Sequence, residues 1–308
     1  MITPINQAKV VIVTINYNGL DDTFRLLSNL KNIDEDVGVI VVDNNSSNNE
    51  ADKIASKYEV VKVIKSQING GFGYANNLGA AYCLDYSNIE YLFVLNNDTV
   101  INSGVISKLY STIEANTDIL CVSPVILNQG GETIWFGGGD FSSLHAGAKS
   151  WFKNKVVDQL KGAPPIIESP FISGCAMFLS KESYSDIGGF DDKFFMYIED
   201  IDFSYRINLI GRAVVSTEVS IEHFAHSSLN IPVSLATPID KKNPSLNFYI
   251  EHVIKGSFFF YRKHFSLLKR MTYYVFLFLK WQKNILKIGS ISKAVVIYKT
   301  YFKYLVNN

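Results

Sequence analysis

The chain has 308 residues, of which 47% are hydrophobic and 13% aromatic. This composition excludes collagen-like, disordered and disulfide-stapled classes, and the length suffices for one large core or for one domain with a substantial appendage. The 29 basic and 29 acidic residues balance overall but are unevenly distributed. From residue 241 onward there are 13 Lys and Arg and one acid, Glu251, which leaves 16 basic and 28 acidic residues before it. The C-terminal part therefore predicts an anionic partner, either nucleic acid or a membrane surface.

The cysteines and the N-terminus bear on the cellular compartment. Cys83, Cys121 and Cys175 are odd in number and lack a close metal-ligand spacing, which indicates reduced core thiols and makes a zinc site improbable. The N-terminus has no basic segment, and its apolar residues 10–13 are too few for a signal peptide. We therefore expect a cytoplasmic protein.

The first hundred residues alternate between strand-like and helix-like segments. Strands are expected at residues 9–16, 37–43 and 60–65, and a further strand ends at Asp98; helices are expected at residues 21–30, 51–57 and 74–86. This alternation predicts an α/β fold with a mostly parallel sheet and helices on both faces. Ligands of such sheets bind at the carboxyl ends of the strands.

The pattern is looser after Asp98. A helix is expected at residues 105–116, a strand at 119–127, an apolar strand at 171–180, a helix at 181–187 and a strand at 214–221. Residues 130–139 hold five glycines around Trp135 and Phe136, which suggests mobile loops near a site. We expect the globular domain to end near residues 238–244, giving a domain of residues 1–240 and a helical region of residues 241–308.

Polar residues follow two of the early strands. Thr14, Asn16 and Asn18 lie at the first strand end, and Asp43 and Asn45 lie at the second. A carboxylate there can accept an N–H of a nucleotide base, and exposed backbone groups can add further contacts. The alternative is that these Asn and Asp residues simply close the strands as turn residues.

A glycine-rich segment, residues 69–79, stands between the third strand and the next helix. Small residues there let backbone N–H groups and a helix N-terminus approach a phosphate. A dinucleotide-binding fingerprint would follow the first strand, so this position disfavours an NAD site.

Asp98 comes directly after a buried-type strand and two amides, Asn96 and Asn97. A cation that also takes diphosphate oxygens needs only one or two protein carboxylates, so Asp98 is a candidate metal ligand. A helix N-cap or a turn is the competing interpretation.

Three acids, Glu199, Asp200 and Asp202, fall within four residues after a run of aromatic side chains. Crowding raises the pKa of carboxyl groups, which suits a general base. The alternative is the acidic first turn of a helix in which Asp202 pairs with Arg206 four residues later. His223 and His226 follow a strand, which keeps a metal role open for them.

Taken together and in this order, these motifs closely resemble the glycosyltransferase family 2 enzymes of GT-A fold, and among them the bacterial rhamnosyltransferase-like branch. The resemblance covers about residues 8–230 and rests on residues 11–18, 41–46, 69–79, 95–98, 173–177 and 188–206. It implies a Rossmann-like, mostly parallel sheet and an inverting transfer of a sugar from a nucleoside diphosphate donor. The branch favours dTDP-L-rhamnose, although galactofuranosyl and hexosyl transferases share these motifs.

The resemblance also implies roles for single residues. Asp200 is expected as the catalytic base beside Glu199, and Asp98 with His223 is expected to hold Mg²⁺ or Mn²⁺ on the donor diphosphate. The expected donor-binding residues, with Asp43 at the base, are Thr14, Asn16, Asn18, Asp43, Asn45, Gly71, Phe72, Asn77 and Asn97, and the expected acceptor-side residues are Gly174 and Tyr197.

Two positions depart from the family pattern. The family's metal motif is often Asp-any-Asp, and here Asn96 replaces the first acid, which implies weaker metal affinity. Relatives often carry glycine three residues after the metal-binding histidine, and here His226 stands there, so either histidine is a candidate ligand. A non-catalytic, nucleotide-sugar-binding relative is the alternative, and the intact Glu199–Asp200 pair disfavours it.

The basic C-terminal region is compatible with helices at residues 248–265 and 267–286. Its longest apolar run, residues 275–279, is far below the ~20 residues of a membrane span. Basic aromatic helices on an anionic membrane surface would suit a lipid-linked glycan acceptor at the inner face of the plasma membrane. The alternative is an appendage that packs on the core or on a second subunit of a homodimer. We expect no nucleic-acid partner because no recognition module is present.

Overall fold

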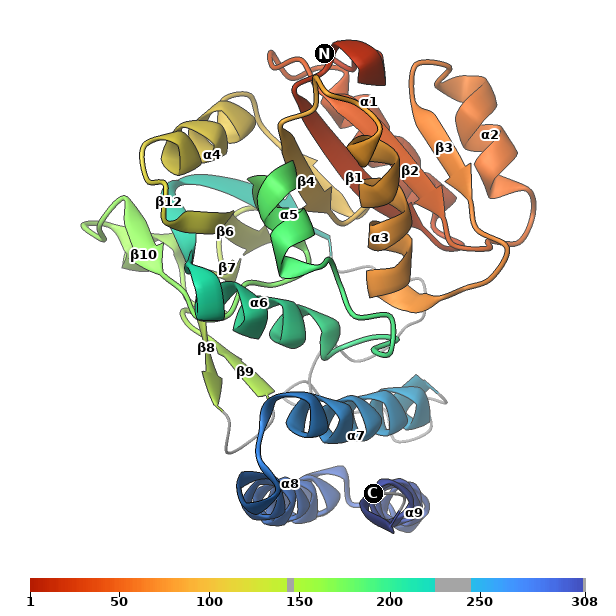
Figure 1. Ribbon diagram of the computed structural model, residues 1–308, viewed down its shortest axis with the longest axis vertical. Coiled ribbons are helices and arrows are strands. Elements are labelled where there is room, and N and C mark those ends of the chain that lie inside the picture. The colour runs from red at the N-terminus through yellow and green to blue at the C-terminus, as the bar shows by residue number, and fades with distance from the viewer. Residues whose placement is uncertain (143–146, 225–244, 307–308) are drawn as a thin grey trace.

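The computed structural model describes residues 1–142, 147–224 and 245–306, and its centre is a ten-stranded sheet (Figure 1). The strand order along the main path is β10-β12-β6-β11-β4-β1-β2-β3, with β5 paired to β12 and β7 to β6. The strands of this sheet are β1 (Val10–Asn16), β2 (Gly38–Asp43), β3 (Lys62–Lys65), β4 (Tyr91–Leu95), β5 (Thr99–Ile101), β6 (Ile119–Asn128), β7 (Ile134–Phe136), β10 (Ile166–Glu168), β11 (Ala176–Ser180) and β12 (Arg212–His223). A separate hairpin pairs β8 (Gly139–Ser142) with β9 (Gly147–Ser150).

Helices surround the sheet, as the alternating sequence pattern predicts. They are α1 (Leu20–Leu30), α2 (Glu50–Lys57), α3 (Gly71–Leu84), α4 (Val105–Glu114), α5 (Lys181–Ile187), α6 (Glu199–Ile210), α7 (Ser245–His264), α8 (Leu267–Ile288) and α9 (Ile291–Val306). α3 packs on β1 and β2, α5 on β4 and β11, and α4 on β6 and β12, while α1 contacts α2 and β5. The mixed α/β architecture with helices on both faces is therefore confirmed.

The N-terminal half of the sheet is parallel. β1 pairs with β2 and β4, and β2 pairs with β3, all in parallel register. The apolar runs of β1, β2 and β4 are almost completely buried, as expected for strands covered on both faces. Their carboxyl ends therefore meet at one edge, where Asn16 and Asp43 lie opposite each other.

The second half of the sheet mixes strand directions. β11 runs antiparallel to β4 and β6, and β12 runs parallel to β6 and antiparallel to β5. The pairing of β5 with β12 sets His223 opposite Thr99, one residue after Asp98. Two segments that are far apart in the sequence thus meet beside the parallel strand ends.

Several predicted boundaries were wrong. The strand expected to reach Asp98 ends at Leu95, and the strand expected from residue 171 begins at Ala176. The glycine-rich residues 130–139 contain β7 and the start of β8 instead of loops alone. The helix expected from residue 74 begins at Gly71, because glycine can adopt the φ of +88° found there. The three cysteines are buried and unbridged, as predicted.

The C-terminal helices form a layer of their own, seen beneath α6 in Figure 1. Helices α7 and α8 confirm the two predicted helical segments, and α9 lies within the predicted helical region of residues 241–308, although no bounds were predicted for it. At Gly256 of α7, a Cβ would lie 2.7 Å from Cγ1 of Ile198, so α7 packs closely against the residue that precedes α6. The expected domain boundary at residues 238–244 lies outside the described residues. Within those residues no helix is both long and apolar enough to span a bilayer.

Candidate active site

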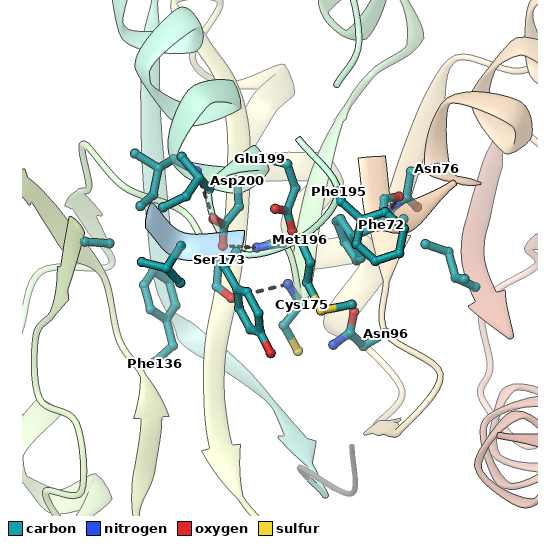
Figure 2. Close-up of a pocket in the computed structure, with 18 of the residues that line it drawn as sticks. Phe72, Asn76, Asn96, Phe136, Ser173, Cys175, Phe195, Met196, Glu199 and Asp200 are labelled. Atoms are coloured by element: carbon teal, nitrogen blue, oxygen red, sulfur yellow. Dashed lines mark hydrogen bonds between the residues drawn. The ribbon is translucent and has the colours of Figure 1, made fainter. Parts of the chain in front are cut away.

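A cavity of about 760 Å³ lies at the carboxyl ends of β1 and β4, between the N-terminal ends of α3 and α6 (Figure 2). Its wall includes the expected residues Gly71, Phe72, Asn97, Asp98, Gly174, Tyr197, Glu199, Asp200 and His223. Figure 2 shows the Asp200 and Glu199 carboxyl groups on one side and Phe72 beside Phe195 on another. The cavity therefore brings together the expected catalytic, metal and acceptor-side residues with three of the expected donor-binding ones.

The start of α3 forms one wall of this cavity. The backbone of Gly71 approaches Phe195 so closely that an added Cβ would lie 2.2 Å from the Phe195 carbonyl oxygen, and the N–H of Phe72 donates to that oxygen at 3.0 Å. Asn44 and Asn69, which the sequence interpretation missed as site residues, line the cavity here. The Asn44 amide donates to Asn69 Oδ1 at 2.9 Å, and Asn69 Oδ1 also accepts from the Gly71 N–H at 3.1 Å. These amides fix the glycine-rich turn.

The two strand ends expected to read the donor base are tied to each other. The Asn16 amide donates to Asp43 Oδ2 at 2.8 Å and to Glu50 Oε2 at 2.9 Å, and Asn16 Oδ1 accepts from Thr23 at 2.8 Å. Asp43 Oδ1 accepts from the Ser46 N–H at 3.0 Å. Asn16 is fully buried and neither residue lines the cavity. Both oxygens of Asp43 therefore already have partners within the chain.

Four other expected donor residues also lie outside the cavity lining. Thr14 is buried in β1, and Asn18 and Asn45 adopt positive φ angles of 51° and 66° in turns, consistent with the turn-residue alternative. Asn77 donates to the Phe190 carbonyl at 2.8 Å and to Asp192 at 2.7 Å, and its oxygen accepts from Tyr184 at 2.7 Å. Asn77 thus ties α3 to the loop before α6.

Asp98 and His223 form a buried pair in the cavity wall. His223 Nε2 lies 3.1 Å from Asp98 Oδ1, and the Phe224 N–H donates to the Asp98 carbonyl at 2.8 Å. The rings of Trp135 and His223 make a T-shaped contact at a centroid distance of 4.6 Å and an interplanar angle of 76°. Trp135 was noticed in the sequence only as an aromatic within the glycine-rich segment, and it also lines the cavity.

The chemistry of this pair fits a divalent cation. The buried Nδ1 of His223 has no hydrogen-bond partner among the described residues, and a buried polar atom of this kind is unusual. The same part of the chain holds no cluster of three or more His, Cys, Asp and Glu side chains suited to a metal. Two protein ligands suffice when diphosphate oxygens and water complete the coordination. His226, the other candidate ligand, lies outside the described residues.

Glu199 and Asp200 open α6 and face the cavity. Asp200 accepts from the Ile201 N–H at 2.9 Å and from the Gly174 N–H at 3.4 Å, whereas Glu199 Oε2 is buried with no hydrogen-bond partner among the described residues. Burial raises the pKa of Asp200 to about 7 despite these backbone bonds. Burial and repulsion from Asp200 raise the pKa of Glu199 to about 8. Such carboxyl groups can exchange protons near neutral pH.

Asp202, the third acid of the motif, has a different environment. It is fully buried and lies 2.9 Å from Arg206, 3.0 Å from Lys263 and 2.7 Å from His264. Burial alone would raise the pKa of Asp202, but the His264 hydrogen bond and the charges of Arg206 and Lys263 outweigh it and lower that pKa. The predicted Asp202–Arg206 pair is confirmed, and Asp202 also anchors α7 to α6.

The C-terminal helices supply part of the cavity wall, which the sequence did not predict. Phe248, Tyr249 and Val253 of α7 and Lys280 of α8 line it. Tyr249 meets the ring of Tyr197 at a centroid distance of 4.9 Å, and Tyr197 itself has a positive φ of 83°. This wall is mainly aromatic and lies beside the acidic residues of α6.

The family comparison agrees with this geometry. A family model described as glycosyl transferase family 2 matches residues 10–188, and a second, described as the N-terminal domain of galactosyltransferase, matches residues 161–228. The first match covers the parallel strands, the start of α3 and Asp98. The second covers Glu199, Asp200 and His223.

Curated relatives include a hexosyltransferase and rhamnosyltransferases. The low-salt glycan biosynthesis hexosyltransferase Agl10 of Haloferax volcanii is 34% identical over 202 residues, which are 63% of this chain and 60% of that protein's length. The N-acetylglucosaminyl-diphospho-decaprenol L-rhamnosyltransferase of Mycobacterium tuberculosis is 24% identical over 243 residues, 72% of this chain and 78% of its own. Rhamnosyltransferase WbbL of Escherichia coli is 24% identical over 225 residues, covering 70% and 84% of the two chains.

Solved structures share the fold. GalNAc-T7, crystallised with UDP, GalNAc and Mn²⁺, matches with a TM-score of 0.58 at 17% identity over 83% of this chain and 50% of its own. Residues 1–349 of S. aureus TarS match with a TM-score of 0.53 at 15% identity over 87% and 69% of the two chains. These likenesses identify the fold as GT-A, as the sequence motifs implied. With the family model spanning residues 10–188, the chain belongs to glycosyl transferase family 2, in company with bacterial rhamnosyltransferases.

Proposed function

We propose that the protein is an inverting glycosyltransferase that moves a sugar from a nucleoside diphosphate donor to a hydroxyl group of a glycan. The observation that carries this proposal is one cavity that holds both the Asp200 carboxyl group and the Asp98–His223 pair. The reaction needs a base for the acceptor hydroxyl and stabilisation of the leaving diphosphate, which a bound cation can supply. Family membership supports the same reaction class.

Asp200 is the proposed base. A sugar hydroxyl has a pKa far above neutrality, so a positioned carboxylate must take its proton as the new C–O bond forms, which contributes about 100- to 10,000-fold. The Gly174 and Ile201 N–H groups hold the Asp200 carboxyl group in place. Inversion requires one displacement and no protein nucleophile, and the buried thiol of Cys175, which lines the cavity, has a pKa raised well above its usual value by burial.

Asp98 and His223 are the residues proposed to hold Mg²⁺ or Mn²⁺. A bound divalent cation would stabilise the negative charge that develops on the leaving nucleoside diphosphate by several kcal/mol. The buried Asp98 carboxylate and the His223 ring line the cavity together with Asn96 and Asn97. The Mn²⁺ in the GalNAc-T7 crystal supports a metal-dependent reaction by analogy of fold.

The proposed donor is dTDP-L-rhamnose, and the proposed acceptor is a growing, lipid-linked polysaccharide of the cell envelope at the inner face of the plasma membrane. The names of two relatives, the N-acetylglucosaminyl-diphospho-decaprenol L-rhamnosyltransferase and rhamnosyltransferase WbbL, support rhamnose, whereas Agl10 is named a hexosyltransferase. A hexosyl or galactofuranosyl transferase therefore stands as the second candidate. We propose residues 1–240 as the catalytic domain and propose that residues 241–308 contact a membrane surface or a second subunit.

A thermal-shift screen of nucleoside diphosphate sugars with Mg²⁺ or Mn²⁺ tests the donor, because a ligand that binds only the folded state raises the melting temperature. Release of nucleoside diphosphate in the presence of acceptor then measures turnover. Asp98→Ala is expected to lose the metal-dependent part of the shift. Asp200→Asn is expected to keep the shift and lose turnover.

These two variants control each other. Full turnover in either one would refute the assignment of that residue. Donor binding that is indifferent to chelator, with no turnover on any acceptor, would instead indicate a non-catalytic sugar-nucleotide-binding relative.

A further inference from the structure

Exposed apolar side chains are concentrated on the last two helices. Among the described residues, 18 large hydrophobic side chains are exposed, and seven of these belong to α8 and five to α9. The other six are scattered from Met1 to Ile210. Because monomeric proteins rarely leave a large contiguous apolar surface in water, this concentration needs an explanation.

These side chains form one stripe along each helix. The α8 stripe is Leu268, Met271, Val275, Leu279 and Leu286, and the α9 stripe is Ile291, Val295, Tyr298, Phe302 and Val306. Steps of three, four or seven residues keep side chains on one face of an α-helix. Each helix therefore presents an apolar face to solvent, interrupted on α8 at Gln282.

The opposite faces of the two helices are buried. Leu277 and Trp281 of α8 and Ile297 and Tyr301 of α9 are inaccessible, and both helices contact α7. Figure 1 shows α8 and α9 as the outermost layer, on the far side of α7 from the sheet. We call the two solvent-facing stripes together the α8–α9 face.

Basic residues border this face. Lys269, Lys283 and Lys287 lie on one flank of the α8 stripe, and Lys299 and Lys303 lie on one flank of the α9 stripe; all five are exposed. Neither helix contains an acidic residue. The charge is therefore complementary to an anionic surface, and two copies of the face would bring lysines together.

We propose that the α8–α9 face docks flat on an anionic lipid bilayer, with its apolar stripes in the acyl boundary and its lysines at the headgroups. Amphipathic helices with this distribution bind at the interface instead of crossing it. Lys280 of α8 lines the cavity and directly follows Leu279 of the stripe, so the cavity wall and the docking face share one helix. The role of this docking rests on the proposed function, because the docked face would let a lipid-linked acceptor enter the cavity beside Lys280.

Co-sedimentation with sucrose-loaded vesicles tests the docking without any turnover. The full chain is expected to pellet with mixed phosphatidylglycerol and phosphatidylcholine vesicles, less with phosphatidylcholine alone and less as salt is raised. The double variant Leu279→Asp/Val295→Asp is expected to bind at least about tenfold more weakly, because it puts two charges on the apolar stripes. Leu84→Asp is the matched control, since Leu84 and Leu279 are 53% and 55% exposed, and it is expected to bind normally.

A second variant separates charge from apolar contact. The binding affinity of the triple variant Lys269→Gln/Lys283→Gln/Lys287→Gln for anionic vesicles is expected to fall about fivefold per lysine, and its affinity for neutral vesicles is expected to stay unchanged. Equal pelleting of the Leu279→Asp/Val295→Asp variant and the control would overturn the proposal. The proposal would also be overturned if the parent protein bound no vesicles and formed a dimer in analytical ultracentrifugation that the Leu279→Asp/Val295→Asp variant dissociates. Vesicle binding without sugar transfer would leave the docking standing and refute the proposed function.

Discussion

Replacing Asp202 with Asn is expected to destabilise the protein strongly. Asp202 is fully buried and contacts Arg206 on its own helix and Lys263 and His264 on α7. The substitution keeps the side-chain shape and removes the negative charge, so Arg206 and Lys263 lose their ion-pair partner and His264 loses a carboxylate hydrogen-bond partner. Because Asp202 lies two residues after Asp200, the same change loosens α6 at its catalytic end.

The size of the effect follows from the burial of the partners. Breaking a buried ion pair by removing one member costs about 3–5 kcal/mol. Lys263 is 31% exposed and water can partly solvate it, so we expect about 2–4 kcal/mol for Asp202→Asn. At about 2–4 °C per kcal/mol for domains of this size, the melting temperature should fall by roughly 4–16 °C.

Asp118→Asn is the matched control, because Asp118 pairs with Arg212 at 2.6 Å while the two side chains are 60% and 39% exposed. Exposed pairs contribute little to stability because water and salt screen them, so this variant should melt within a few degrees of the parent protein. Urea unfolding should also show a pH dependence. Because the pKa of Asp202 is lowered in the folded protein, its carboxylate stabilises the fold fully at pH values above the ordinary Asp pKa of 3.8. This stabilisation is lost as the pH falls below 3.8 and passes through the pKa of the folded state. Equal falls in melting temperature for Asp202→Asn and Asp118→Asn would refute the reasoning. So would a stability difference between the parent protein and Asp202→Asn that does not become smaller at acid pH.

Three further predictions concern the cavity. Turnover should rise about tenfold between pH 6 and pH 8, because Asp200 with a pKa of about 7 acts only when ionised; a flat rate profile down to pH 5 would contradict its role as base. The raised pKa of Glu199 means that the folded state holds a proton that the unfolded chain releases, so the parent protein should lose stability as the pH rises from the ordinary carboxyl range through about 8. Glu199→Gln should abolish this loss, and urea unfolding at pH 6 and pH 9 measures it. Gly71→Ala should lower the free energy of unfolding by more than about 2 kcal/mol, because its Cβ would meet the Phe195 carbonyl at 2.2 Å. Gly188→Ala is the control, with φ of +82° and no atom within 4 Å of the added Cβ, and it should lower the free energy of unfolding by about 1 kcal/mol. Equal losses of stability would exclude the close contact as the cause.

The local features of the fold could be predicted because they depend on short segments. Local sequence patterns indicate three of these features: the apolar run of β4, the acidic first turn of α6 and the glycine-rich start of α3. Boundaries were less accurate where glycine or a tertiary contact sets them. Gly71 begins α3 early because it can take a positive φ against Phe195.

The side-chain partners could not be predicted from local pattern. His223 reaches Asp98 only because β12 pairs with β5, and the residues alone left its role open. Asn16 and Asn77 were expected at the donor, yet the hydrogen bonds of both side chains join segments of the protein itself. The aromatic wall from α7 was missed because nothing in its sequence says which surface it covers.

The cavity is built from both ends of the chain. Residues from the parallel strands and α3 form one part of its wall, and Phe248, Tyr249, Val253 and Lys280 form another. Under the proposed function, the first part would hold the sugar nucleotide and the second part would face the acceptor, so relatives that differ only in the second part would be expected to differ in the molecule that receives the sugar. Exchanging residues 245–306 between relatives is therefore a way to redirect the product without redesigning the donor pocket, provided that the Asp202 contacts travel with α7.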